Sequence, residues 1–167
     1  RLGLARSFQL PKPFHTLNLI DNLRVPLLYT VNARPGHSLS DTEVRGRCDE
    51  LLEAVALADK ARRLPRDLTQ VEMRKLELAR AVATEPRLLF ADEAMAGLSP
   101  SEVEEIIAVL LRLNQQGITI VLIEHIMRAV MSFSTRLLVL VAGQKIADGL
   151  PQEVMRNPEV ERAYLGE

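Results

Sequence analysis

Residues Arg87-Leu-Leu-Phe-Ala-Asp-Glu-Ala-Met-Ala-Gly-Leu-Ser-Pro100 decide the fold that this chain can adopt. Four apolar residues, Leu88 to Ala91, run directly into two carboxylates, Asp92 and Glu93. An apolar run without polar alternation predicts a strand covered on both faces, as in a parallel α/β sheet. Ligands of such sheets bind at the carboxyl ends of the strands. The two acids are therefore candidates for a metal ligand and a general base, with a solvated strand end as the alternative.

Length and composition limit the class of protein. The chain has 167 residues, with 21 basic and 22 acidic side chains and a net charge of −1. This length suits one domain with a substantial core. The balanced charge provides no basic field for nucleic acid, so we expect no nucleic-acid partner. No apolar run approaches the roughly 20 residues that span a bilayer, so any contact with a membrane is expected through a partner.

Helix starts are predicted by three sequences with the spacing of a capping box. They are Ser40-Asp-Thr-Glu43, Thr69-Gln-Val-Glu72 and Ser99-Pro-Ser-Glu102. An earlier helix is expected to begin at Thr16, and Pro26 should kink or end it. The first of the capped helices is expected to end near Ala58.

Strands are predicted on either side of these helices. Residues 2–9 should form a short strand that ends at Gln9, and the apolar run 118–123 a second one that ends in Glu124-His125. A third apolar strand, 137–141, should turn back through a hairpin. The tail, 151–164, should be helical with a break at Asn157-Pro158. We therefore predict an α/β fold with a mostly parallel sheet flanked by helices, and a helical subdomain.

Chemistry is expected where the strands end. In a parallel sheet the ends of neighbouring strands lie at one edge, so Asp92, Glu93 and His125 could converge on one ligand. Carboxylate oxygens suit Mg²⁺, which keeps several waters and is completed by substrate phosphates. A second carboxylate could orient or deprotonate a water, and a histidine could donate to a phosphate oxygen.

Ordered motifs along the chain resemble those of ABC-transporter ATPases. They are Gln9, Leu68-Thr-Gln-Val-Glu72 running into Arg74-Lys-Leu-Glu-Leu-Ala-Arg-Ala81, Leu88 to Pro100, and His125. In that family these are the Q-loop, the signature motif, the Walker B strand with its catalytic glutamate and D-loop, and the H-switch. The resemblance implies the C-terminal part of a P-loop ABC ATPase domain. Its parts would be a Q-loop strand and loop (1–12), a helical subdomain with the signature motif (13–84), and a RecA-like half (85–167).

Three stretches are similar to the ATPase subunits of branched-chain amino-acid importers. They are Ala-Arg-Ser-Phe-Gln9, Ile123-Glu-His-Ile-Met-Arg-Ala-Val-Met131 and Asn157-Pro-Glu-Val-Glu-Arg-Ala-Tyr-Leu-Gly-Glu167. The lipopolysaccharide-export ATPase has a similar tail. The resemblance implies transmembrane permease subunits, a second ATPase subunit and, indirectly, a periplasmic or extracellular solute-binding protein as partners. It also implies a cytoplasmic location, peripheral on the inner face of the cell membrane.

The resemblance implies a role for each matching residue, with ATP and Mg²⁺ as cofactors. Asp92 would hold Mg²⁺ through water, Glu93 would polarise the attacking water, and His125 would contact the γ-phosphate. Gln9 would sense that phosphate, contribute to the metal site and link to the permease. The remaining nucleotide-binding residues would be Thr69, Gln70, Val71, Glu72 and Ser99. The signature helix would offer its N-terminus to the nucleotide of the opposite subunit, since free N–H groups and the helix dipole attract phosphate.

The sequence departs from the family pattern in the residues that bind phosphate. The loop G-x-x-x-x-G-K-[S/T] does not occur within these 167 residues. We therefore expect the chain as given to bind ATP poorly, and expect it to be the C-terminal fragment of a longer protein. Val71 stands where the family usually has a glycine, so its β-branched side chain should obstruct the γ-phosphate. Glu72 replaces a glutamine and adds negative charge, Ala94 replaces a proline, and Ser99 stands where Asp or Asn is expected.

Two functions of different classes follow. The first is an ATP-hydrolysing subunit of an importer, for branched-chain amino acids. The second is a degenerate, non-hydrolysing interaction module of an ABC complex. An ATPase of the lipopolysaccharide-export type is an alternative within the family. The near-zero net charge argues against a DNA-associated ABC ATPase.

The sequence also predicts how stable the isolated chain is. Half of a doubly wound sheet leaves a strand edge and an apolar helix face uncovered. We therefore predict that the isolated 167-residue chain self-associates or melts with low cooperativity. Analytical ultracentrifugation and a thermal melt would check this, and a monomer with a sharp cooperative melt would contradict it.

Overall fold

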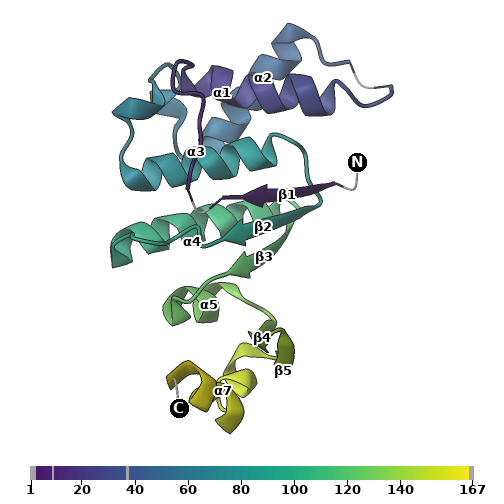
Figure 1. The fold of residues 1–167 in the computed structure, drawn as a ribbon. Coiled ribbons are helices and arrows are strands. Elements are labelled where there is room, and N and C mark those ends of the chain that lie inside the picture. Colours follow the sequence, from purple (N-terminus) through teal and green to yellow (C-terminus); the bar gives the residue numbers. More distant parts are fainter. Residues whose placement is uncertain (1–2, 9, 37, 166–167) are drawn as a thin grey trace. The chain divides into compact units, whose positions relative to one another are not determined.

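A computed structural model describes residues 3–8, 10–36 and 38–165, and Figure 1 shows their fold. The chain forms two compact units, Arg1–Ile123 and Glu124–Glu167. The division that the sequence suggested, at residues 12/13 and 84/85, stays a prediction.

The first unit contains a parallel sheet of three strands in the order β1-β2-β3 (Figure 1). The strands are β1 (Leu4–Ser7), β2 (Leu88–Asp92) and β3 (Thr119–Ile123). Asp92 lies opposite Ile123 in the register of β2 with β3, and Arg6 lies opposite Phe90 in that of β1 with β2. The predicted parallel sheet is confirmed, and the carboxyl ends of its strands share one edge.

Burial alternates along the strands of this sheet. In β2, Leu89 and Ala91 are buried, whereas Leu88, Phe90 and Asp92 are only half-buried. In β3, Thr119, Val121 and Ile123 are exposed. The prediction that the apolar run is covered on both faces is therefore wrong for this unit. An apolar run shows that a strand can be buried on both faces, but it does not determine whether other elements pack against both.

The described part of the first unit contains the α-helices α1 (Leu19–Pro26), α2 (Asp41–Ala54), α3 (Gln70–Val82) and α4 (Pro100–Gln115). The last three of them begin where the capping boxes predicted. A π-helical turn, η1 (Leu27–Val31), and two 3₁₀ turns, η2 (Ala58–Lys60) and η3 (Pro65–Asp67), complete the unit. Reciprocal capping by Ser40, Thr69 and Ser99 is present at α2, α3 and α4. Pro26 ends α1 as expected, while α2 ends at Ala54, four residues earlier than predicted.

The start of α1 differs from the prediction. Asn18, not Thr16, is its N-cap, and the Asn18 side chain accepts from the N–H of Asp21. The difference arises one turn later, at the fully buried Asn22. Its Oδ1 accepts from the N–H of Phe14 at 2.8 Å, and its Nδ2 donates to the carbonyls of Phe14, Leu17 and Asn18 at 3.0–3.1 Å. These bonds hold 14–18 as a loop, so the helix cannot start before it.

Helix α3 is the centre of the first unit. It packs against α1, α2, α4, β1 and β2, and nine of its thirteen residues are buried. Charged side chains of α3 that lie in this packed region have partners. Lys75 donates to Glu105 of α4 at 2.6 Å, and Arg80 donates to Glu77 at 2.8 Å and to the carbonyl of Lys12 at 2.8 Å. Burying a charge is costly unless it is paired, so these contacts make the central position of α3 possible.

The second unit is a hairpin with three helices. Strands β4 (Leu137–Val141) and β5 (Gln144–Gly149) pair antiparallel, and the helices are α5 (Met127–Phe133), α6 (Pro151–Val154) and α7 (Pro158–Leu165). The two turn residues, Ala142 and Gly143, both have positive φ, as a type I′ turn requires. Arg136 donates two hydrogen bonds to Asp148 at 2.8 and 2.9 Å. These bonds, and one from Lys145, lower the pKa of Asp148 to about 2. The predicted hairpin and the helix break before Pro158 are confirmed.

Asn22 is expected to be among the most sensitive polar positions of the fold. Asn22→Ala removes the partner of one N–H and three carbonyl groups, and should lower the free energy of unfolding by about 3 kcal/mol. Asn114→Ala is the control, because among the described residues that side chain donates to a single carbonyl, that of Ile118, and its loss should cost about 1 kcal/mol. Urea denaturation of both variants checks this, and equal losses would contradict the role given to Asn22.

Candidate active site

Asp92 ends β2 at the carboxyl edge of the sheet. Its side chain is 22% exposed and forms an ion pair with Arg6 of the neighbouring strand β1. The parallel register brings the pair together, since Arg6 lies opposite Phe90, two residues before Asp92 on the same face of β2. A carboxylate of the kind that could bind a cation is therefore held here by a guanidinium.

Glu93 lies directly beyond the strand in an unusual backbone conformation. Its φ is +47°, in the left-handed region that residues other than glycine seldom occupy. The N–H of Glu93 donates to the carbonyl of Ile123, at the end of β3, at 2.9 Å. Such a conformation costs about 1–3 kcal/mol and persists only where the surroundings impose it, and it is concentrated at functional sites. The half-buried Glu93 is therefore fixed by the ends of two strands.

The loop from Glu93 to Ser99 packs against the start of α3. Gly97 has φ +77°, and a Cβ atom placed on it would lie 3.1 Å from Nε2 of Gln70. Ser99 caps α4, where its Oγ donates to Glu102 at 2.7 Å and its N–H donates to the same carboxylate at 2.8 Å. The structure thus brings the predicted residues Asp92, Glu93, Gln70 and Ser99 into one region. It also gives Ser99 a structural task that accounts for its hydroxyl.

The N-terminus of α3 is already occupied by its own side chains. Glu72 accepts from the N–H of Thr69 at 3.0 Å and forms an ion pair with Lys60. Burial acts to raise the pKa of Glu72, but the hydrogen bonds from Lys60 and Thr69 outweigh it and hold that pKa below its ordinary value. Val71 is buried in the chain, with 7% of its surface exposed. The obstruction expected from the Val71 side chain stays a prediction.

The structure does not place two of the predicted site residues relative to the others. Gln9 lies outside the described residues. His125 is exposed and belongs to the second compact unit, in the bend between β3 and α5. Within the first unit the ends of β2 and β3 do meet, as predicted, but convergence of His125 on the acids stays a prediction.

The donor set at the sheet edge fits one kind of metal site. No group of three or more His, Cys, Asp or Glu side chains suited to a metal ion is found among the residues that the structure describes. A closed site of the zinc type therefore has no support there. Mg²⁺ needs only one or two carboxylates when water and phosphate oxygens complete its shell. Asp92, with Glu93 beside it, fits that chemistry.

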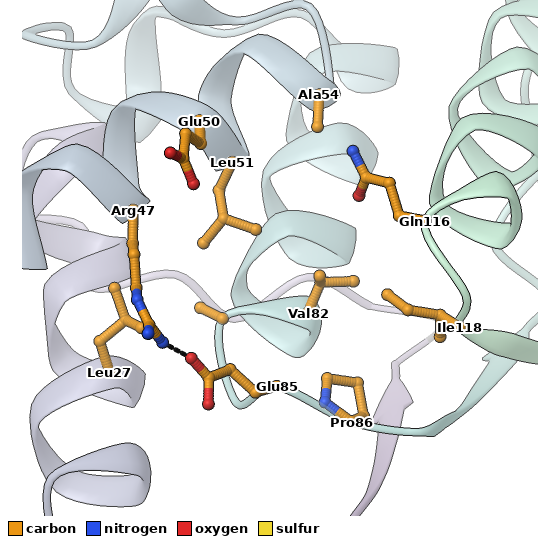
Figure 2. A pocket seen from close by; sticks show the side chains of 11 residues that line it. Leu27, Arg47, Glu50, Leu51, Ala54, Val82, Glu85, Pro86, Gln116 and Ile118 are labelled. Carbon is orange, nitrogen blue, oxygen red and sulfur yellow. Dashed lines mark ion pairs between the residues drawn. The ribbon is translucent and has the colours of Figure 1, made fainter. Parts of the chain in front are cut away.

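A pocket of about 490 Å³ lies elsewhere in the first unit. Figure 2 shows the side chains that line it. It is lined by Leu27, Arg47, Glu50, Leu51, Ala54, Val82, Ala83, Glu85, Pro86, Gln116 and Ile118. Glu85, with φ +52°, forms ion pairs with Arg47 across the pocket and with Arg34 at 3.2 Å. Neither acid of the sheet edge lines it. The pocket is therefore a different feature from the candidate site.

Sequence reasoning missed two features of the site. The first is Arg6, which lies beside Asp92. On β1, Ala5 and Ser7 are buried and Arg6 between them is exposed. This alternation, together with parallel pairing to 88–92, could have indicated the contact. The second is the left-handed backbone of Glu93. It accompanies a hydrogen bond to Ile123, thirty residues away, and no local sequence pattern predicts it.

Acids at the end of a parallel strand, beside the start of a capped helix, are the arrangement in which α/β proteins bind and cleave nucleotides. Comparison with known proteins agrees with this class. The pattern of the ABC transporter family matches residues 3–96, and that of the branched-chain amino acid ATP-binding cassette transporter matches 144–167. This chain belongs to the ABC transporter family of ATP-binding proteins.

Relatives and solved structures extend over nearly the whole chain. The high-affinity branched-chain amino acid transport ATP-binding protein LivG of Salmonella typhimurium is 36% identical, covering 100% of this chain and 69% of LivG. The corresponding protein BraF of Pseudomonas aeruginosa is 35% identical over the same shares. The ADP conformation of MJ1267, an ATP-binding cassette of an ABC transporter, matches with a TM-score of 0.82 and 28% identity over 99% of this chain and 69% of that one. In the part of the chain that the structure describes, no helix is long and apolar enough to cross a membrane.

The charge of Glu72 gives a pH dependence. The pKa of Glu72 is lower in the folded chain than its ordinary value, so the charged form adds stability above the ordinary carboxyl range. That contribution is lost as the pH falls through the lower, folded pKa. At pH about 7, Glu72→Gln should therefore reduce the free energy of unfolding by about 0.5–1 kcal/mol, and the difference should shrink as the pH falls below the ordinary carboxyl range.

Denaturation at several pH values measures this difference. Glu53→Gln, at an exposed position of α2, is the matched control and should change stability little at any pH. A deficit of Glu72→Gln that is the same at both ends of the range would contradict the ionic role of Glu72.

Proposed function

We propose that this chain is part of the ATP-hydrolysing subunit of an ABC importer for branched-chain amino acids. One observation carries the proposal, which is the 36% identity with LivG across the entire chain. The match of 144–167 to the branched-chain amino acid cassette pattern supports it independently. The protein would act at the cytoplasmic face of the membrane, with permease subunits and a second ATPase subunit as direct partners. A periplasmic or extracellular solute-binding protein would deliver the amino acid to the permease.

The acids at the end of β2 would divide the work. Asp92 would hold Mg²⁺ through water, and bound Mg²⁺ would neutralise charge on the phosphates. Glu93 would orient and polarise the water that attacks the γ-phosphate. The hydrogen bond that fixes the backbone of Glu93 supports this role, because a base must be held at a defined position relative to the reacting atoms. Gln9 and His125 would complete the site as sensor and phosphate contact.

The start of α3 would face the nucleotide of the second ATPase subunit. A helix N-terminus attracts phosphate, and Thr69, Gln70 and the backbone of Val71 would provide its donors. Glu72 would weaken that attraction, although its ion pair with Lys60 offsets part of its charge. Ser99 would lie at the interface between the two subunits. We therefore propose that a site completed by this helix binds nucleotide less strongly than a site completed by a helix without a carboxylate at this position.

A non-hydrolysing interaction module is the second candidate. The side chains around α3 favour it, because Thr69 and Glu72 already satisfy N–H groups that would otherwise bind phosphate. Such a module would use the same fold to dock on a permease or partner ATPase without turnover. Catalysis by Glu93 separates the two candidates.

Turnover can be measured in a completed cassette. The completed cassette is a fusion of the N-terminal segment of Escherichia coli LivG with the 167 residues of this chain. By the family pattern, that segment carries the phosphate-cradling loop. We predict ATP hydrolysis by the completed cassette, and a loss of at least about a hundredfold in kcat for Glu93→Gln, because a positioned base contributes about 10²–10⁴.

Glu50→Gln is the matched control, since Glu50 lines the separate pocket, and it should hydrolyse ATP at the unmodified rate. Leucine uptake in a strain without LivG is the second readout and should follow the same order. Turnover that survives Glu93→Gln would overturn the catalytic assignment. A folded, dimeric cassette with no turnover at all would favour the interaction module.

A further inference from the structure

Arg6 provides a cationic side chain in contact with Asp92, the proposed metal ligand. Its guanidinium donates to Oδ2 of Asp92, and its side chain is 56% exposed. It also lies over the ring of Phe8, 5.9 Å from the ring centroid. The backbone of Arg6 is fixed by pairing with β2, so the side chain reaches Asp92 from a rigid strand.

The two side chains of this ion pair differ in their exposure to solvent. Asp92 is largely shielded, whereas most of the Arg6 side chain is in solvent. A carboxylate that accepts from a guanidinium has one oxygen engaged and its charge offset. A divalent cation that approaches Asp92 then meets both a positive charge and a partly occupied ligand.

We propose that Arg6 competes with divalent metal for Asp92, and so lowers the affinity of the empty site for free Mg²⁺. The proposal rests on the metal-binding role proposed above for Asp92. Metal would then bind mainly together with the nucleotide, whose phosphates supply further oxygen ligands and attract the guanidinium away from Asp92. Arg6 is thus a positioning residue that couples metal binding to nucleotide binding.

The size of the effect follows from the exposure of the pair. Half-exposed ion pairs are weak in water and screened by salt. Removal of the Arg6 charge should therefore raise the affinity for free metal by roughly two- to fivefold at low ionic strength. A gain of affinity with an otherwise unchanged amide spectrum separates this prediction from a merely structural role of Arg6.

The test uses the ¹⁵N-labelled completed cassette and Mn²⁺ alone, without nucleotide. Paramagnetic broadening of the backbone amides of Asp92 and Glu93 reports metal at this edge of the sheet. In Arg6→Gln the Mn²⁺ concentration at half-broadening should fall roughly two- to fivefold. Arg6→Lys keeps the charge and should stay near the unmodified value. Arg45→Gln removes the same charge from an exposed position of α2 and should have no effect.

Asp92→Asn separates this inference from the proposed function. It should abolish the broadening both on its own and when it is combined with Arg6→Gln. If Asp92→Asn abolishes broadening but Arg6→Gln leaves the midpoint unchanged or higher, the competition is refuted and the metal role of Asp92 stands. If broadening persists in Asp92→Asn, the metal role fails, and the competition fails with it.

Discussion

Parallel pairing of β2 between β1 and β3 is the constraint on which the candidate site depends. Because the three strands run in the same direction, their carboxyl ends meet at one edge. β1 brings Arg6 to Asp92, and β3 brings the carbonyl of Ile123 to the N–H of Glu93. The charge balance of Asp92 and the backbone conformation of Glu93 are both consequences of strand register. A shift of register by one residue would turn these side chains to the opposite face and dismantle the site.

Helix α3 connects this edge to the rest of the first unit. Its buried residues form the centre of the core, while its first turn lies beside the loop that follows Glu93. The contact between Gln70 and Gly97 leaves no room for a Cβ atom without displacement, and the φ of Gly97 already favours glycine. One helix therefore serves both stability and the proposed contact with a second subunit. Substitutions in its first turn should affect both properties together.

Much of this could be predicted from the sequence, because the signals are local. Three capping boxes each fix a helix start within a few residues, and the hairpin and the parallel strands follow from apolar runs and turn residues. The predictions failed where the contacts of a particular side chain or the packing of a whole sheet decide. Asn22 moves the start of α1 by binding the loop before it, and partial exposure of β3 depends on what packs against the sheet. The ion pair of Arg6 with Asp92 joins residues 86 positions apart and needs the register of two strands.

The most direct test of the central claim, that the end of β2 is the catalytic edge, is the position of metal and nucleotide. Crystals of the completed cassette grown with Mn²⁺ and a non-hydrolysable ATP analogue would give it through the anomalous signal of manganese. We expect a manganese peak beside Asp92, bridged by water, with the terminal phosphate next to Glu93. Nucleotide bound elsewhere, for example in the pocket of Arg47 and Glu85, with no manganese beside Asp92, would contradict it.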